Sequence, residues 1–179
     1  MCCKLLKNAA LMKARGIGFS EINAAMAAAE FTIIAGSNTI IACHDKGKLN
    51  KTLSKVWSAL AFLDKNTQGG MSKNKQLKDT DMQKTSGVYK MEHGTKIPDG
   101  WQSTVLGIVA DDPQKLRGDR ADFLIYEESG SWKGLDTAIT QGEALIEIGG
   151  VRFGVSVIGG TGGDSGAALE GLRKVYYDP

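Results

Sequence analysis

The 179-residue sequence contains few cysteines and histidines and no long apolar run. Its three cysteines, Cys2, Cys3 and Cys43, have no regular spacing, which argues against a disulfide framework and for a reducing compartment. The two histidines, His44 and His93, do not combine with the cysteines into a zinc-type pattern. The apolar runs fall far short of the ~20 residues that a transmembrane helix needs, and no secretory signal is evident. We therefore expect an intracellular protein with no membrane role.

The charge balance and composition are those of an ordinary globular chain. The net charge is only +2, so any contact with nucleic acid would have to come from local patches. Apolar residues make up 42% and charged residues 23%, and we expect residues 1–179 to form a single domain with a real core. Residues 66–84 are rich in Lys, Gln, Asp and Gly, which predicts a mobile loop. A loop that contacts DNA or a partner is the alternative for this segment.

Apolar runs and helical patterns alternate along the chain. The runs expected to form strands are residues 9–12, 39–43, 88–97, 103–109, 121–126 and 151–158. Helical patterns cover residues 21–30, 46–65 and 135–148, and Ser20 is suited to cap the first of them. Strands interleaved with helices are typical of an α/β fold with a largely parallel sheet. Such folds bind ligands at the carboxyl ends of the strands.

Residues 13–20, KARGIGFS, lie between an expected strand and an expected helix and approximate a phosphate-binding loop. The standard loop reads G-x-x-x-x-G-K-[ST]. Gly18 and Ser20 match this pattern, but Phe19 stands where lysine belongs and Lys13 where the first glycine belongs. Spacing alone therefore leaves two explanations open: a phosphate loop that has been altered, or a glycine turn before a serine-capped helix.

The chemistry that a phosphate loop needs is nevertheless present. Gly16, Gly18 and the start of the helix can turn backbone N–H groups toward an anion. Lys13 or Arg15 would supply the cation that position 19 lacks, and the Ser20 hydroxyl would ligate Mg²⁺. The candidate nucleotide-binding residues are Lys13, Ala14, Arg15, Gly16, Ile17, Gly18, Phe19 and Ser20.

Two acidic residues, Glu127 and Glu128, follow the apolar run at residues 121–126. Adjacent carboxylates at the end of a buried strand repel each other unless a cation lies between them. In P-loop ATPases the first acid serves the metal and the second polarises the attacking water. We therefore expect Glu127 to be a metal ligand together with Ser20, and Glu128 to be catalytic. Two carboxylates that are merely solvated at a strand end are the alternative.

A glycine-rich segment at residues 159–166 follows the last expected strand. Its glycines would allow a ligand to approach closely. Thr161 is expected to sense the γ-phosphate or to orient water, from a strand next to the acid-bearing one. A flexible turn is the alternative.

Together these segments resemble the large terminase subunit of tailed bacteriophages. Three motifs carry the resemblance: KARGIGFS, LRGDRADFLIYEESGSW from residue 116, and GGTGGDSGAALEGL with VYYDP from residue 159. The similarity runs from about residue 11 to the C-terminus, apart from residues 66–84. Terminases often carry Arg-Gly before the acid-bearing strand, as at Arg117 and Gly118. Some place the loop lysine at the front of the loop, which makes Lys13 its stand-in.

The resemblance implies a P-loop NTPase fold of the RecA-like, ASCE class: a three-layer sandwich with a mainly parallel central sheet. It implies an ATPase that uses ATP and Mg²⁺ to drive double-stranded DNA into a procapsid in the host cytoplasm. The implied partners are DNA, the portal protein, the small terminase subunit and further copies in a homo-oligomeric ring, a pentamer on the portal. Arg15 is a candidate catalytic arginine within the chain, and Arg117 and Arg120 are candidates acting on a neighbouring subunit.

The chain is much shorter than members of that family, which carry a C-terminal nuclease domain. We therefore expect the nuclease domain, and nuclease activity, to be absent. Family members also have an N-terminal segment that helps to hold the adenine. A truncated P-loop fold that binds nucleotide, DNA or a partner with little or no turnover remains an alternative, and Phe19 favours it. A different P-loop enzyme, such as a helicase-like ATPase, is a weaker one.

Overall fold

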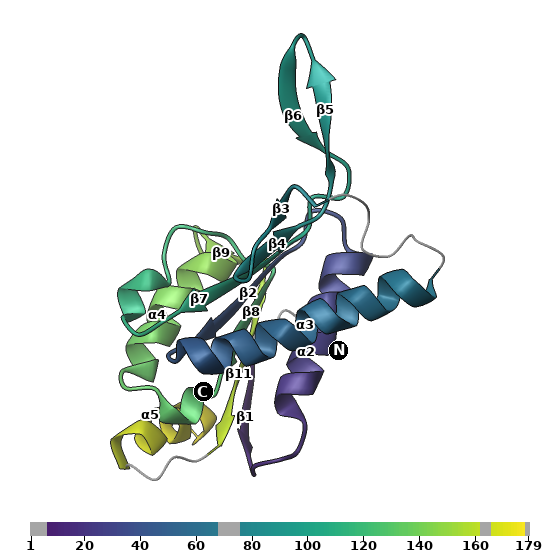
Figure 1. Ribbon diagram of the computed structural model, residues 1–179. Coiled ribbons are helices and arrows are strands. Elements are labelled where there is room, and N and C mark those ends of the chain that lie inside the picture. The colour runs from purple at the N-terminus through teal and green to yellow at the C-terminus, as the bar shows by residue number, and fades with distance from the viewer. Residues whose placement is uncertain (1–6, 68–75, 162–165, 178–179) are drawn as a thin grey trace.

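The computed structural model describes residues 7–67, 76–161 and 166–177 (Figure 1). Within them, seven strands form one sheet in the order β1-β11-β8-β2-β7-β4-β3. The bounds are β1 Ala9–Lys13, β11 Val155–Thr161, β8 Phe123–Glu127, β2 Asn38–Cys43, β7 Thr104–Val109, β4 Gln83–Thr85 and β3 Lys78–Asp79. The first five in this order are parallel, and β4 and β3 extend the sheet as antiparallel strands.

Helices cover both faces of the sheet, which makes three layers (Figure 1). Helices α2 (Phe19–Ile33) and α3 (Lys46–Asn66) pack together on one face. Helices α4 (Leu135–Ile146) and α5 (Gly166–Tyr177) lie on the other. Two 3₁₀ turns, η1 (Pro113–Lys115) and η2 (Ser129–Ser131), flank β8 in the sequence. This architecture confirms the expected α/β fold with a mainly parallel central sheet.

The core lies where the two central strands meet the helices. Every residue of β8 is buried, as are Thr39 to Cys43 of β2. Strands covered on both faces are expected to read as continuous apolar runs, and these two do. Helix α3 contributes an apolar stripe at helical spacing through Leu49, Leu53, Val56 and Leu60, all at most 3% exposed.

The segment at residues 66–84 differs from the mobile loop that its composition predicts. Asn66 is the last residue of α3, and residues 68–75 are outside the described part. Strand β3 lies in the second half of the segment, and β4 begins there. Strand β4 forms despite its polar sequence because its backbone pairs with β7. Its Lys84 also lies over the Trp57 ring, 5.1 Å from the centroid, and forms an ion pair with Asp79.

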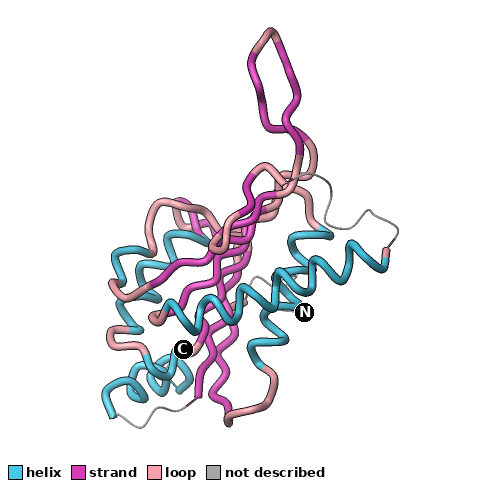
Figure 2. Tube along the Cα trace, in the orientation of Figure 1, coloured by secondary structure: helices cyan, strands magenta, loops and turns pink. Residues whose placement is uncertain are grey.

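Residues 88–97, expected as one strand, form a hairpin of β5 (Val88–Glu92) and β6 (Thr95–Asp99). The turn has positive φ at both His93 (48°) and Gly94 (80°), as a two-residue hairpin turn requires. This ribbon stands away from the rest of the molecule (Figure 2).

The expected strand at residues 151–158 also divides. Residues Val151–Arg152 form β10, which pairs with β9 (Glu147–Ile148), and only β11 joins the main sheet. The predicted helix at residues 135–148 therefore ends two residues early, because its last two residues pair as β9. No helix in the described part of the chain is long and apolar enough to cross a membrane.

Candidate functional site

The carboxyl ends of three neighbouring strands bring the predicted site residues together. Lys13 ends β1 and pairs with Thr161 at the end of β11. Glu127 ends β8, which pairs with β11 on its other side. The expectation that Thr161 lies on the strand next to the acid-bearing one is thus confirmed. Motifs that are far apart in the sequence thus lie together at one edge of the sheet.

The loop from β1 to α2 turns on two glycines in left-handed conformation. Gly16 has φ 80° and Gly18 has φ 78°, values that L side chains rarely adopt. Gly18 caps α2, and its carbonyl accepts hydrogen bonds from the N–H groups of Glu21 and Ile22, both at 3.0 Å. Ser20 is therefore not the cap that its residue type predicts but lies in the first turn of the helix, which leaves its hydroxyl free for the acid across the site.

Phe19, at the position where a standard loop has lysine, is a core residue. Its side chain is 4% exposed and packs against Gly159 of β11, where an added Cβ would lie 2.1 Å from the ring Cζ. The buried Phe19 side chain therefore cannot contact a ligand, and only the backbone of this residue can. The same contact shows that Gly159 leaves no room for a ligand, contrary to the prediction for residues 159–166; Gly162 and Gly163 of that segment lie outside the described residues. Gly160 is equally occupied, since its Cβ would lie 2.2 Å from the backbone N of Gly130 in η2.

Lys13 reaches the site from the front of the loop. Its side chain is 7% exposed, and Nζ lies 3.4 Å from Glu128 Oε1 and 3.3 Å from Thr161 Oγ1. The same amino group lies 5.5 Å from the centroid of the Phe19 ring. Lys13, Glu128 and Thr161 thus form one hydrogen-bonded cluster, although 148 positions separate the first from the last.

Glu127 is held from three sides. The Ser20 hydroxyl donates to its Oε1, and the amide Nδ2 of Asn23 donates to Oε2 at 2.7 Å. The indole N–H of Trp132 donates to its backbone carbonyl at 3.1 Å. The carboxylate is 1% exposed, so these partners replace the water that a charged group loses on burial. Asn23 was not predicted from the sequence, where it is one polar residue in the first turns of a helix.

Glu128 follows directly in the sequence and has a left-handed backbone, with φ 54°. Its carbonyl accepts hydrogen bonds from Ser131, from the backbone N–H at 3.1 Å and from the hydroxyl at 3.0 Å. A left-handed conformation at a residue other than glycine costs on the order of 1–3 kcal/mol and is typical of functional sites. The two adjacent carboxylates therefore have different surroundings: Glu127 is buried and Glu128 is 28% exposed.

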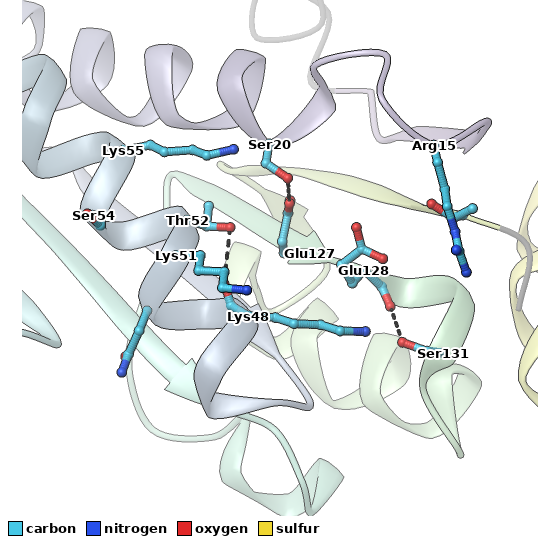
Figure 3. A pocket seen from close by; sticks show the side chains of 12 residues that line it. Arg15, Ser20, Lys48, Lys51, Thr52, Ser54, Lys55, Glu127, Glu128 and Ser131 are labelled. Carbon is cyan, nitrogen blue, oxygen red and sulfur yellow. Dashed lines mark hydrogen bonds between the residues drawn. The ribbon is translucent and has the colours of Figure 1, made fainter.

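Ser20, Glu127, Glu128 and Thr161 line a cavity of ≈ 840 Å³, and Lys13 contacts two of them from outside its lining (Figure 3). Its lining residues are Arg15, Ser20, Lys48, Asn50, Lys51, Thr52, Ser54, Lys55, Glu127, Glu128, Ser131 and Thr161. Half of these belong to α3, whose polar face looks like an ordinary solvated face in the sequence. Lys55 points toward Ser20 and forms an ion pair with Glu21 at 2.9 Å (Figure 3). Four basic residues thus surround two carboxylates, which suits an anionic ligand bound together with a cation.

Cys43 ends β2 and His44 follows it, near enough to the site for the charges of Glu127 and Glu128 to act on them. Burial raises the pKa of the Cys43 thiol to about 11, so the group is a neutral thiol at pH 7. Burial, and then the nearby charge of Lys48, lower the pKa of His44 below its ordinary value. The imidazole is therefore neutral at pH 7, and the positive charge of the cavity comes from its lysines and Arg15.

The donor set fits Mg²⁺. The hydroxyl of Ser20 and the carboxylate of Glu127 are hard oxygen ligands placed side by side at the cavity wall. Magnesium is usually bound by one or two such protein groups together with water and substrate phosphates. A triphosphate in the cavity would supply the remaining ligands.

Arg117 and Arg120 are not brought to this cavity. They precede β8, whereas the site follows its carboxyl end, and they line a separate cavity of ≈ 420 Å³. Arg120 donates to the carbonyls of Ala144 and Glu147, at 2.9 and 3.0 Å, at the end of α4. Arg117 donates to Gln141 at 2.8 Å. Within one chain both arginines thus contact α4 or the strand that follows it.

No protein-family model and no curated protein sequence matches the chain. Among solved structures, the large terminase ATPase domain of Thermus phage P74-26 is similar, with TM-score 0.68 and 19% identity over 92% of this chain and 62% of that one. A mutant of the same domain gives TM-score 0.65 and 18% identity over 86% and 59%. The large terminase of bacteriophage HK97 gives TM-score 0.58 and 13% identity over 95% of this chain and 33% of that one.

At these identities the likeness establishes a shared fold. The chain shares its α/β fold, with a mainly parallel central sheet, with the P74-26 large terminase ATPase domain. It spans 59% to 62% of the length of the P74-26 domain structures.

Proposed function

We propose that this chain is the ATP-hydrolysing part of a motor that packages viral DNA. The observation that carries the proposal is the convergence of Lys13, Glu128 and Thr161 in one cluster, beside the Ser20–Glu127 pair. A cation, a base, a polar sensor and a metal-binding pair are the parts that phosphoryl transfer to water needs. The fold shared with the P74-26 and HK97 proteins supports the same activity.

Each residue has a distinct part in the proposed hydrolysis. Ser20 and Glu127 would hold Mg²⁺, which when bound neutralises charge on the phosphate oxygens. Glu128 orients and polarises the attacking water, because its carboxylate faces the cavity and is only partly buried. Lys13 exchanges its contact with Glu128 for the γ-phosphate, which frees the base as the substrate binds. Thr161 then keeps the water or the phosphate in line.

The backbone of residues 14–20 would cradle the phosphates. The first turn of α2 presents its N–H groups beyond Gly18, and a helix N-terminus favours an anion. Arg15 lines the cavity from the loop and would add positive charge within the same chain. Completion of the site by an arginine from a neighbouring subunit remains part of the proposal.

The resemblance to large terminases supports a proposal for the translocated substrate and the partners. Double-stranded DNA would be the translocated substrate, and the portal protein, the small terminase subunit and a ring of identical chains would be the partners. The site of action would be the cytoplasm of the infected host.

A second candidate function is nucleotide binding with little or no turnover. Two observations favour it. Phe19 occupies the lysine position with a buried ring, and Lys13 is already bonded to Glu128 and Thr161. If the binding of ATP does not release Lys13 from Glu128, the Glu128 carboxylate stays paired and cannot act as the base.

Hydrolysis of ATP by the purified chain, with and without double-stranded DNA, tests the proposal. Glu128→Gln should lower the rate by ~10²-fold or more, because general-base catalysis contributes about that factor. Glu92→Gln, an exposed site on the β5–β6 ribbon, is the matched control and should hydrolyse like the wild type. Equal rates for wild type and Glu128→Gln would remove Glu128 from the mechanism. Tight binding of ATP without turnover would favour the second candidate.

A further inference from the structure

Asn23 is a fully buried polar residue at the proposed metal site. It lies on α2 one turn after Ser20, so both side chains point from the same face of the helix toward the end of β8. Asn23 Nδ2 donates to Glu127 Oε2 at 2.7 Å, and Ser20 donates to the other carboxylate oxygen. Each oxygen of Glu127 thus has its own partner from α2.

The cost of this arrangement argues that it serves more than stability. The neighbours of Asn23 on the helix, Ala24 and Ala27, are apolar and at most 2% exposed. The amide oxygen Oδ1 is buried and accepts no hydrogen bond from the described residues. A buried polar atom left in this state costs about 1–3 kcal/mol. An apolar side chain here would avoid that cost but would leave Glu127 Oε2 without its donor.

The bond to Asn23 also decides which way the carboxylate of Glu127 faces. With Oε2 tied to the helix interior, Oε1 is the oxygen directed at Ser20 and the cavity. The backbone of Glu127 is fixed independently by Trp132, whose indole donates to the Glu127 carbonyl at 3.1 Å. Trp132 fixes only the backbone, so the hydrogen bonds from Asn23 and Ser20 are what restrain the side-chain torsions of Glu127.

We infer that Asn23 is a positioning residue for a divalent cation: its amide holds the Glu127 carboxylate so that Oε1 and the Ser20 hydroxyl form a ready pair of ligands. The inference rests on the proposed function, because the cation is the one bound with the nucleotide. Partners that orient a metal ligand typically change metal affinity by ~10–100-fold when removed. Asn23 is predicted to act on the metal and not on the phosphate loop.

The test separates metal binding from nucleotide binding. The affinity for fluorescently labelled ADP is measured with EDTA and with Mn²⁺, for wild type, Asn23→Ala and Asn23→Ser. In the wild type Mn²⁺ should tighten binding, and in both variants ~10-fold or more of that enhancement should be lost. The dissociation constant in EDTA should stay within about 2-fold of the wild type, because the phosphate loop is unchanged.

Thr32→Val is the matched control. It removes a buried hydroxyl from the same helix, whose hydrogen bond goes to the Ala28 carbonyl at 2.8 Å and not to the site. Its Mn²⁺ enhancement should equal that of the wild type, even if its melting temperature falls. A role of Asn23 limited to stability would make Asn23→Ala behave like Thr32→Val.

Each result decides between the two proposals. Loss of the Mn²⁺ enhancement in Asn23→Ala or Asn23→Ser, with binding in EDTA retained, supports the positioning role. An unchanged enhancement in a folded variant overturns that role and leaves the nucleotide site standing. A wild type that binds no labelled ADP in either condition overturns both. Asn23→Ser, which is smaller but still polar, keeps the test available if the alanine variant does not fold.

Discussion

The contact between Phe19 and Gly159 should make alanine at position 159 strongly destabilising. An added Cβ would lie 2.1, 2.4 and 2.8 Å from ring atoms Cζ, Cε1 and Cε2, whereas carbon atoms in contact are normally ~3.5–4.0 Å apart. The ring must therefore move by more than about 1 Å, yet it is 4% exposed and has no open space. Gly159 does not have positive φ, so backbone strain adds nothing.

Overpacking of this kind costs about 1–3 kcal/mol. For a chain of 179 residues, each kcal/mol lowers the melting temperature by ~2–4 °C, which gives a decrease of about 2–12 °C for Gly159→Ala. Phe19→Leu should also destabilise, because it removes buried ring atoms. The double variant should lose less than the sum by at least ~1 kcal/mol, since the smaller leucine makes room for the new methyl group.

Chemical denaturation of the four proteins of this cycle measures the coupling. Gly47→Ala is the control, because its Cβ would meet only the Asp45 side chain, at 3.2 Å, and it should combine additively with Phe19→Leu. If Gly159→Ala and Phe19→Leu were additive within ~0.5 kcal/mol, the ring would not pack on Gly159. Phe19, which stands at the lysine position of a standard phosphate loop, would then not be a core residue packed on Gly159.

Three further predictions concern other parts of the molecule. Arg120→Ala should lower the free energy of unfolding by about 0.5–1.5 kcal/mol in denaturant, because the carbonyls of Ala144 and Glu147 lose an exposed donor; an unchanged free energy would contradict this contact with the end of α4. Cys43 should be alkylated ~100-fold more slowly than a free cysteine at pH 8, because its pKa is raised from 9.0 to about 11 and a smaller fraction of the thiol is present as the reactive thiolate. Peptide mass spectrometry of iodoacetamide-treated protein measures the rate, and a rate equal to that of free cysteine would refute the prediction. Gly142→Ala should lower the melting temperature, because its methyl group would lie 1.8 Å from the Tyr126 hydroxyl; an unchanged temperature would contradict the packing of α4 on β8.

Much of the fold was predictable because the central strands are buried on both faces. Residues 40–43 and 123–126 contain no charged residue, which is the pattern expected of strands that helices cover on both sides. The phosphate loop, the two acids and Thr161 were predicted to lie at a common edge for a different reason: the carboxyl ends of parallel strands meet at one edge of the sheet. Strand β4 escaped prediction because its backbone pairing with β7, not its side chains, makes it a strand.

The site was predicted only where a motif carries it. Lys13, Ser20 and Glu127 stand at positions that a phosphate loop and an acid-bearing strand define. Asn23 and the lysines of α3 have no such signal, because polar residues on a helix look alike whether they face solvent or a cavity. The burial of Phe19 was equally hidden, since it depends on Gly159, 140 positions away, having no side chain.

The central claim is that nucleotide binds at the carboxyl edge of the sheet with Lys13 at its phosphates. Equilibrium binding of labelled ATP in Mg²⁺ to wild type and Lys13→Ala tests it most directly. A charge-assisted hydrogen bond contributes about 1.5–3 kcal/mol, so Lys13→Ala should bind ~10–100-fold more weakly. Lys90→Ala, on the exposed β5–β6 ribbon, should bind like the wild type. Equal affinity for wild type and Lys13→Ala would contradict the account.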